Sequence, residues 1–247
     1  MTFLQRILKS IVDELSQGQK PFAIILAGHN GSGKSTMWRT YLSDMVQIPL
    51  INADRMMLSL LPEASEETPL SEWAVQIRDK HTDWMRIAQK GVEIFTAQAV
   101  EKKVNFAMET VFSHWKRDSK TGKVESKIDK IHQLQKDGYY VILLFVGLMD
   151  AELSITRVKT RTADKKTPGH DVPLDKLIKR FPRTQEAIRH AITVADASIL
   201  VDNSRTPDEA FTLCRVQKRK NVLFDLRQSR QSVPREIEAW MSKVCPD

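Results

Sequence analysis

Cysteine is scarce in this sequence: only Cys214 and Cys245 occur, far apart and without the spacing of metal ligands. Neither a disulfide framework nor a zinc site is therefore indicated, and the scarcity fits a reducing cytosol. Long hydrophobic runs are also missing, since the longest, residues 139–149, is too short to span a bilayer. The first 20 residues have acids within their apolar pattern and no small-residue cleavage site, so they predict an amphipathic helix rather than a signal peptide. We expect a cytoplasmic protein.

The charge balance is basic, with 38 Lys and Arg against 31 Asp and Glu and a formal net charge of +7. One interpretation is an anionic partner, either nucleic acid or a phosphate-rich small molecule; the other is an ordinary solvated surface. The composition, 41% hydrophobic and 28% charged, is that of a globular protein with a sizeable core. No repeat, low-complexity tract or linker divides the chain, so residues 1–247 are predicted to form a single domain.

Five short apolar runs are strand candidates: residues 22–28, 48–54, 104–110, 139–147 and 197–203. Most are nearly continuous rather than alternating, as expected of strands that are covered on both faces. The segments between them are long and carry apolar residues at helical spacing, for example residues 70–103 and 127–138. This alternation predicts an α/β fold in which a mostly parallel, five-stranded sheet is flanked by helices and joined by right-handed crossovers.

Three segments lie outside this alternation. Residues 1–20 predict an N-terminal helix, and residues 150–190, which are basic with Pro and Gly near their centre, predict a lid-like insertion between the fourth and fifth strands. Residues 205–247 are expected to form a C-terminal helical extension. Its last helix is predicted to follow Pro234, with a docking face formed by Ile237, Trp240 and Met241.

The stretch GHNGSGKST follows the first strand candidate and precedes a helix predicted to begin near Lys34. It matches the phosphate-binding loop pattern G-x-x-x-x-G-K-[ST], in which backbone N–H groups converge on phosphates and glycines allow positive φ and close approach. In this pattern Lys34 reaches the β- and γ-phosphates and the Ser35 hydroxyl coordinates Mg²⁺. We therefore expect ATP or GTP, with Mg²⁺, to be bound by Gly28, His29, Asn30, Gly31, Ser32, Gly33, Lys34, Ser35 and Thr36.

The signatures of several other users of this loop are absent from the sequence. There is no base-reading N-K-x-D of GTPases, no signature loop of ABC transporters, and no strand that ends in the two acids typical of motor and AAA ATPases. Single acids follow four of the strand candidates instead, at Asp54, Glu109, Asp150 and Asp202. In an open parallel sheet the carboxyl ends of the strands form the ligand crevice. Asp54 and Glu109 are therefore expected beside the loop, where a small kinase holds its acceptor.

Taken in order, GHNGSGKST, INADRM, AMETVFS, RVKTRTADKKTPGHDVP and ADASILVDNS resemble the zeta toxin family. Its members are P-loop kinases, best known as toxins of toxin–antitoxin pairs, that phosphorylate UDP-N-acetylglucosamine. The resemblance covers about residues 22–204 and is closer to the shorter, zeta-like branch than to the founding toxins. It implies transfer of a γ-phosphoryl group to a hydroxyl of a nucleotide sugar, and a small antitoxin protein as a partner.

The resemblance also implies roles for the acids at the strand ends. Asp54 matches the family's aspartate, which takes the proton of the acceptor hydroxyl; the structural alternative is that it caps the following helix. Glu109 matches the glutamate that hydrogen-bonds the sugar acceptor, with Thr110 and Ser113 as further hydroxyl contacts. An ion pair with a nearby arginine is the alternative for Glu109, because a carboxylate at the end of a buried strand needs a partner.

Arginines are expected to stabilise the charge that spreads over the γ-phosphoryl oxygens during transfer, since a guanidinium binds such oxygens in bidentate fashion. Arg157 and Arg161 lie one helical turn apart and are the first candidates, while Arg180 and Arg183 compete with them. His170 has no evident nucleophile or metal partner, so a role in lid folding or acceptor contact is favoured over catalysis.

Two segments keep a functional and a structural interpretation. Asp202 and Asn203 follow the fifth strand, where P-loop kinases often contact the nucleotide base, but a turn before SRTPDEA explains them equally well. Residues 113–123 (SHWKRDSKTGK) are basic and either contact acceptor diphosphates or form a solvated hairpin.

Two rival functions also stay open. A polynucleotide kinase on the same scaffold would bind oligonucleotides with a strong salt dependence, whereas a nucleotide-dependent binding module would bind ATP without transfer. The N-terminal helix, at about residues 3–17, either caps the nucleotide site in place of a separate antitoxin or packs on the sheet.

Overall fold

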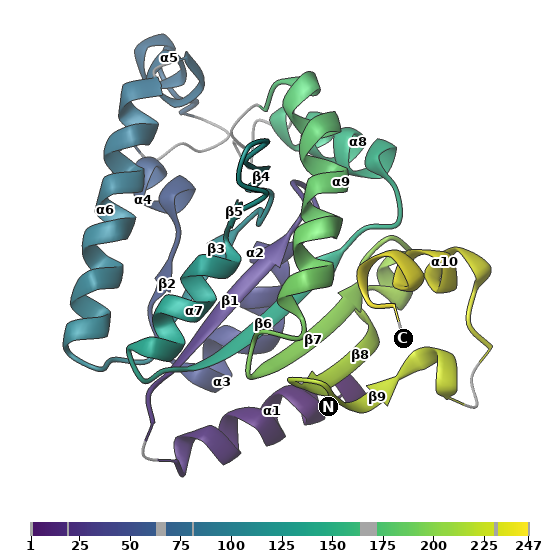
Figure 1. The fold of residues 1–247 in the computed structure, drawn as a ribbon. Helices are drawn as coiled ribbons and strands as arrows, with labels where there is room; N and C mark the ends of the chain where they lie inside the picture. The colour runs from purple at the N-terminus through teal and green to yellow at the C-terminus, as the bar shows by residue number, and fades with distance from the viewer. Residues whose placement is uncertain are drawn as a thin grey trace.

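The computed structural model describes residues 2–18, 20–62, 68–80, 82–163, 172–229 and 232–246. A seven-stranded sheet, in the order β2-β3-β1-β6-β7-β8-β9, forms its centre (Figure 1). The strands are β1 (Phe22–Gly28), β2 (Leu50–Ile51), β3 (Phe106–Thr110), β6 (Tyr140–Gly147), β7 (Ala197–Asp202), β8 (Thr212–Lys218) and β9 (Asn221–Asp225). The first five strands in spatial order are parallel, and β8 and β9 extend the sheet in antiparallel fashion. A separate hairpin pairs β4 (Trp115–Arg117) with β5 (Val124–Ser126).

Helices cover both faces of this sheet (Figure 1). They are α1 (Phe3–Ser16), α2 (Lys34–Met37), the π-helical turn η1 (Trp38–Leu42), α3 (Ser43–Val46), α4 (Ala53–Ser59), α5 (Glu72–Lys80), α6 (Thr82–Glu101), α7 (Ile128–Lys136), α8 (Ala151–Ala163), α9 (Leu174–Ala191) and α10 (Arg235–Val244), with the 3₁₀ turns η2 (Pro207–Glu209) and η3 (Leu226–Gln228). No helix of the described residues combines the length and the apolar character that crossing a membrane requires.

The alternating side chains of β1 divide the core into two layers. Ile25 and Ala27 belong to a cluster shared with α7, α9 and α10, whereas Ile24 and Leu26 belong to a cluster shared with α1, α2 and η1. All seven residues of β1 are buried. A strand that is covered on both faces needs apolar residues at every position, which explains why this strand is a continuous apolar run in the sequence.

Parallel pairing brings the polar residues at the strand ends to one edge of the sheet. Leu26 of β1 pairs with Glu109 of β3, and Gly147 of β6 pairs with Asp202 of β7. The loop that follows β1 therefore leaves the sheet between the ends of β3 and β6, which are its two neighbours. This is the position of the ligand crevice in open α/β sheets.

The predicted α/β fold, with its mainly parallel sheet, is confirmed, and each of the five strand candidates contains a strand. The N-terminal helix packs on the sheet, where Leu4, Leu8 and Ile11 are buried against strand residues. It lies along the bottom of Figure 1, away from the arrowhead of β1, so the alternative that it caps the nucleotide site is wrong. Helices α8 and α9 occupy the predicted lid region, whose residues 164–171 lie outside the described residues.

The expected helical extension over residues 205–247 is wrong for most of that segment, and the sheet has seven strands rather than five. β8 and β9 occupy residues 212–225, and α10 is the α-helix found in the described part of the segment. The sequence conceals β8 because this strand buries Arg215 and Gln217 among its apolar residues. A buried strand with polar residues at these positions lacks the continuous apolar run by which the parallel strands are recognised.

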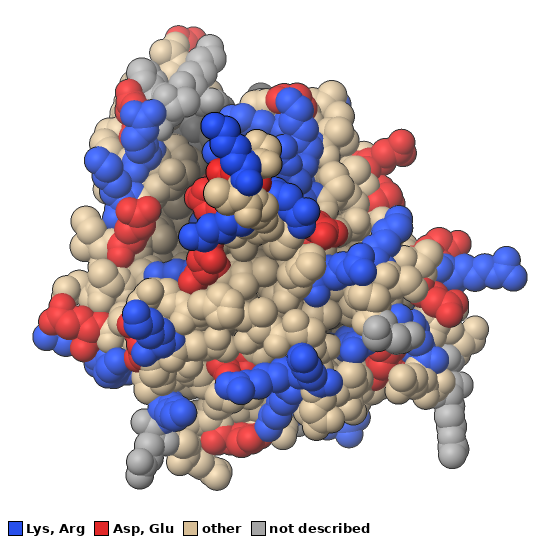
Figure 2. Space-filling view, viewed as in Figure 1, with Lys and Arg blue, Asp and Glu red and all other residues tan. Residues whose placement is uncertain are grey.

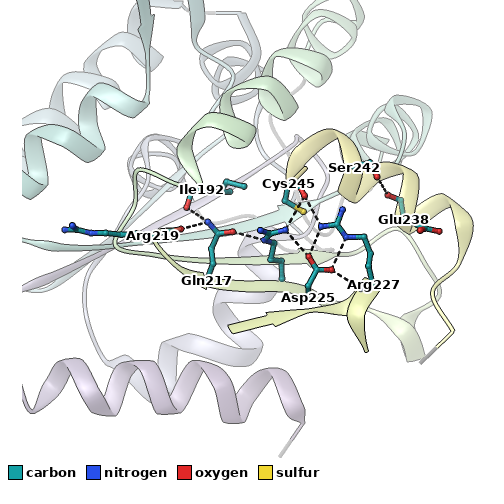
Figure 3. A network of polar contacts seen from close by, with 9 residues as sticks. Ile192, Gln217, Arg219, Asp225, Arg227, Glu238, Ser242 and Cys245 are labelled. Carbon is teal, nitrogen blue, oxygen red and sulfur yellow. Dashed lines mark hydrogen bonds and ion pairs between the residues drawn. The ribbon is translucent and has the colours of Figure 1, made fainter. Parts of the chain in front are cut away.

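A polar network allows β8 to carry these residues into the core (Figure 3). Arg215 donates to Gln217 Oε1 at 2.8 Å and to Asp225 Oδ2 at 2.9 Å. Arg227 donates to the same carboxylate at 2.7 Å and to the Cys245 carbonyl oxygen at 3.1 Å. Because a buried charge is costly unless it is paired and hydrogen-bonded, the network fixes β8, β9 and the end of α10 relative to one another.

The predicted docking face of α10 is confirmed, since Ile237, Trp240 and Met241 are all buried. Trp240 lies directly against Gly147, where β6 ends, so that a Cβ atom at position 147 would overlap its indole ring. The indole also stacks on Phe145 of β6, with ring centroids 6.0 Å apart. Gly147 is therefore required for the close approach of α10 to the sheet.

We predict that Trp240→Ala lowers the free energy of unfolding by about 3–5 kcal/mol, because it removes a large side chain from a well-packed core. Trp73→Ala, at a position that is 55% exposed, is the matched control and should cost about 0.5 kcal/mol or less. Gly147→Ala should cost about 1–3 kcal/mol by overpacking, and this cost should shrink in the Trp240→Ala background. Urea denaturation of the four variants measures these differences, and equal losses in the two tryptophan variants would contradict the packing described.

Candidate functional site

The loop between β1 and α2 has the backbone conformation of a phosphate-binding loop. Gly31 and Gly33 have φ values of +71° and +92°, which side chains rarely tolerate. A Cβ at Gly33 would also lie 2.5 Å from the Asn203 side-chain nitrogen. The helix predicted to begin near Lys34 begins at that residue. Its N-terminus, with its free N–H groups, therefore points at the same space as the loop.

Lys34 is buried, and backbone oxygen atoms hold its ammonium group. Nζ donates to the carbonyl oxygens of Gly28 at 3.1 Å and His29 at 2.9 Å, and it lies 4.0 Å from Glu109 Oε1. Burial is the largest effect on its pKa and lowers it. The negative charges of Glu109 and Asp54 raise the pKa, and the positive charge of Arg161 lowers it. Three charged groups from three other elements therefore act on Lys34 at this edge of the sheet.

Glu109, at the end of β3, connects the loop lysine to two polar neighbours. Its carboxylate accepts a hydrogen bond from Asn52 Nδ2 at 2.7 Å and lies 3.3 Å from the Ser35 hydroxyl. The alternative of an ion pair with an arginine is therefore not what the described residues show, since the cation beside Glu109 is Lys34. The carboxylate is well placed to orient ligands on the Ser35 side of the loop.

Asp54 lies in the first turn of α4 and is exposed. The structural alternative, that it caps this helix, is wrong because the cap is Asn52, whose side-chain oxygen accepts from Arg55 N at 3.1 Å. Asp54 is thus left with a solvent-accessible carboxylate whose charge acts on Lys34. A carboxylate in this position can orient or deprotonate a hydroxyl group.

The residues present fit a magnesium ion that is held together with nucleotide phosphates. No group of three or more His, Cys, Asp or Glu side chains among the described residues could hold a metal by itself. Mg²⁺ seldom requires such a cage, because it binds through one or two protein oxygens, phosphate oxygens and retained water. The exposed Ser35 hydroxyl beside the two Glu109 oxygens supplies an oxygen-only set of this kind.

Helix α8 holds the phosphate-binding loop in place through hydrogen bonds. Ser154 Oγ donates to the Asn30 carbonyl oxygen at 2.7 Å, and the Arg157 guanidinium donates to the Asn203 carbonyl oxygen at 2.7 Å. The Asn203 side chain in turn donates to the Ser32 carbonyl oxygen at 2.8 Å. These bonds hold the loop at two carbonyl groups, those of Asn30 and Ser32, without using the N–H groups that face a phosphate.

The arginine candidates differ in their surroundings. Arg157 is half-buried and held by Asn203, and Arg161 is exposed with its charge acting on Lys34. Arg180 lies close to His29 and Asn30 of the loop. Arg183 is exposed on α9, and His170 lies outside the described residues. The structure therefore brings Arg157, Arg161 and Arg180 around the loop, and their roles stay predictions.

Asp202 is fully buried and forms the predicted turn. Its carboxylate accepts from the Ser204 hydroxyl at 2.6 Å, while Ser204 Oγ accepts from Met149 N. Burial raises the pKa of Asp202 despite these bonds. Asp150 accepts from Leu153 N at 2.7 Å at the start of α8. Both acids thus have structural tasks, whereas contact of residues 202–203 with a nucleotide base stays a prediction.

Thr110 and Ser113, the hydroxyl residues predicted to contact the acceptor, lie at the end of β3 and just after it. Thr110 Oγ1 accepts from Phe112 N at 3.2 Å, within a bend where Phe112 has a φ of +60°. Ser113 is half-buried in the segment that leads to β4. The segment 113–123 forms most of the β4–β5 hairpin, over which Lys and Arg side chains gather in Figure 2. Trp115 of this hairpin stacks on His190 of α9, with centroids 4.8 Å apart.

Sequence reasoning missed three residues that hold the site together: Asn52, Ser154 and Phe181. Asn52 precedes Asp54 in the INADRM motif, so the spacing of a helix cap was a usable signal. Ser154 and Phe181 lie on α8 and α9 and contact the loop only through the tertiary fold. No local pattern identifies such partners.

Comparison with known proteins agrees with this geometry. The family model for zeta toxins matches residues 5–228. An uncharacterized protein of Haemophilus influenzae is 26% identical over 159 residues, which are 64% of this chain and 91% of that protein.

Three solved structures share the fold. The PezAT chromosomal toxin–antitoxin system of Streptococcus pneumoniae contains a chain with a TM-score of 0.53 and 14% identity, and the match covers 100% of this chain and 90% of that one. The AvrRxo1-ORF1:ORF2 complex contains a chain with a TM-score of 0.62 and 14% identity, covering 98% and 72%, respectively. A structure of the same complex with ATP has a TM-score of 0.59 and 15% identity, with the same coverage.

We predict an acid-dependent loss of stability that originates at His29. Burial, followed by the positive charge of Lys34, lowers the pKa of His29 from 6.5 to about 3. As the pH falls, His29 is therefore protonated in the unfolded chain while it stays neutral in the folded protein. The resulting stability is fully present above about pH 6.5 and is lost as the pH falls toward 3, by about 1.4 kcal/mol per pH unit.

His29→Phe, which keeps a ring but cannot be protonated, serves as the reference for this effect. Between pH 7 and pH 5 the wild-type protein should lose about 2 kcal/mol more than His29→Phe in urea denaturation. Parallel pH dependences in the two proteins would show that His29 is not buried in the neutral form.

Proposed function

Because the chain belongs to the zeta toxin family of P-loop kinases, we propose that it transfers the γ-phosphoryl group of ATP or GTP to a hydroxyl of a nucleotide sugar resembling UDP-N-acetylglucosamine. The observation that carries the proposal is the set of charges around Lys34: Glu109, Asp54 and Arg161 all act on its pKa. A loop that only binds nucleotide needs no exposed carboxylate beside its lysine. A kinase needs one to receive the acceptor proton.

In the proposed reaction, the loop N–H groups and Lys34 hold the β- and γ-phosphates. The oxygen of the acceptor hydroxyl attacks the γ-phosphorus in line, and Asp54 accepts the proton of that hydroxyl. The bond from the γ-phosphorus to the bridging oxygen breaks, and the nucleoside diphosphate leaves with the electron pair. Ser35, with Glu109 beside it, would hold Mg²⁺, which would supply positive charge to the phosphates.

The remaining residues position these groups. Glu109 orients the Ser35 hydroxyl and contacts the acceptor together with Thr110 and Ser113. Arg161 stabilises the charge on the transferred group, with Arg180 beside the loop as the second guanidinium. Arg157 takes part through Asn203, by holding the loop in shape, which is supported by its 2.7 Å bond to the Asn203 carbonyl.

We further propose that the chain acts as the toxin of a toxin–antitoxin pair and that a separate small protein holds it inactive. The likeness to a chain of the PezAT system supports this role.

A polynucleotide kinase is the second candidate. The exposed Lys116, Arg117, Lys120 and Lys123 of the β4–β5 hairpin, beside Glu109 in the chain, favour an extended anionic acceptor (Figure 2). Oligonucleotide binding that weakens steeply with salt supports this candidate, and binding that is absent or indifferent to salt excludes it.

The decisive experiment is phosphoryl transfer from γ-labelled ATP with Mg²⁺ to UDP-sugars, NAD, mononucleotides and RNA. We predict labelled UDP-N-acetylglucosamine with the wild-type protein. Asp54→Asn should lower the transfer rate at least about 100-fold, because the proton acceptor is lost, and should leave ATP affinity within about threefold. Lys34→Ala should impair both binding and transfer.

The matched control is Asp13→Asn, since Asp13 is an exposed aspartate on α1. Its transfer rate should equal that of the wild-type protein. Transfer that survives Asp54→Asn would overturn the assigned role of Asp54. ATP binding without transfer to any acceptor would favour a nucleotide-dependent binding module instead.

A further inference from the structure

The side chain of His29 has no task in phosphate binding, because the loop binds phosphate through its backbone. Its ring is nevertheless buried, and it stacks on Phe181 of α9 with centroids 4.0 Å apart and planes 16° apart. Its edge meets Phe145 of β6 at 5.7 Å. Neither ring nitrogen has a hydrogen-bond partner among the described residues. The contacts of this side chain are therefore those of an aromatic ring rather than those of an imidazole.

The backbone of the same residue holds the catalytic lysine. The His29 carbonyl oxygen accepts a hydrogen bond from Lys34 Nζ at 2.9 Å. His29 thus contacts Lys34 through its backbone and helix α9 through its side chain. A shift of this backbone on phosphate binding must move the ring that stacks on Phe181.

Helix α9 can bend next to the residue that stacks on the His29 ring. Pro182 lies inside the helix directly after Phe181, and a proline in a helix removes one backbone hydrogen bond and permits bending. The turn before Pro182 carries Arg180, which lies close to His29. The turn after it is fixed, since Thr184 Oγ1 donates to the Val111 carbonyl oxygen at 3.3 Å. The first half of α9 rests on α8 through Leu177 and Val158, and on the loop through Phe181.

We propose that His29 is a positioning residue whose ring couples the phosphate-binding loop to the first half of α9, so that nucleotide binding sets the position of Arg180. The inference rests on the proposed function and deepens it. The coupling needs a planar ring and no ring nitrogen, so phenylalanine can replace histidine and alanine cannot.

Hydrogen exchange measured by mass spectrometry tests this coupling without requiring a known acceptor. In the wild-type protein, saturating ATP with Mg²⁺ should slow exchange in peptides that cover residues 174–181. His29→Phe should keep this response, whereas His29→Ala and Phe181→Ala should lose most of it. ATP affinity, measured by calorimetry in parallel, should stay within about threefold in His29→Phe and His29→Ala.

His190→Ala is the matched control. His190 also stacks on an aromatic ring, at 4.8 Å from Trp115, and lies on the same helix, but beyond the proline. Its removal should leave the response of residues 174–181 unchanged. If His29→Ala does not fold, Phe181→Ala still tests the coupling, because it removes the other ring of the same stacked pair.

The kinetic counterpart is a selective loss of turnover. With a productive acceptor, His29→Ala should lower kcat by about tenfold or more with little change in the KM for ATP, because Arg180 is misplaced. His29→Phe should restore kcat and keep the pH–rate profile of the wild-type protein. A merely structural ring would change stability without this separation of kcat from KM.

The outcomes separate the two proposals. ATP binding without any response of α9 in the wild-type protein would overturn the coupling alone. Loss of the response in His29→Phe would also overturn it, because a ring nitrogen would then be required. A wild-type protein that binds no ATP would overturn the proposed function and the coupling together.

Discussion

The burial of one ammonium group is the constraint on which the site depends. Lys34 is 8% exposed, and burial lowers its pKa, so its charge persists only with compensation from nearby oxygens. The carbonyls of Gly28 and His29 and the carboxylate of Glu109 supply that compensation. They come from the loop and from the end of the neighbouring strand, so the register between β1 and β3 determines the electrostatics of the site.

Lys34 and the acids around it are the part of the site that the sequence predicts. The loop pattern positions Lys34 and Ser35, and parallel pairing positions the acids that end the next strands, as Glu109 and Asp54 show. Both inferences need only the order of strands along the chain and the rule that their carboxyl ends meet. The choice between Asp54 and Asn52 as the helix cap was not predicted, because both are good caps and tertiary contact with Glu109 decides between them.

The rest could not be predicted because it depends on partners distant in the sequence. In the sequence, the residues of β8 and β9 have the character of a polar segment. In the structure, Arg215 and Arg227 both donate hydrogen bonds to the carboxylate of Asp225. Asn203 resembles a turn residue until its amide is seen on the Ser32 carbonyl. Polar residues in these places follow no periodicity, since each is satisfied by a few specific partners distant in the sequence rather than by a face of the fold.

Helix α9 connects the phosphate-binding loop to the segment that follows β3 and to the β4–β5 hairpin. Phe181 contacts the phosphate loop, Thr184 bonds to the strand segment that follows Glu109, and His190 stacks on the basic hairpin. The proline lies between the first of these contacts and the other two. In the proposed reaction, α9 is fixed after the proline and able to bend before it, so that it adjusts to the nucleotide while it holds the residues predicted to contact the acceptor. Under the proposed function, one element rather than two independent loops would then align donor and acceptor, and close alignment is what in-line transfer requires.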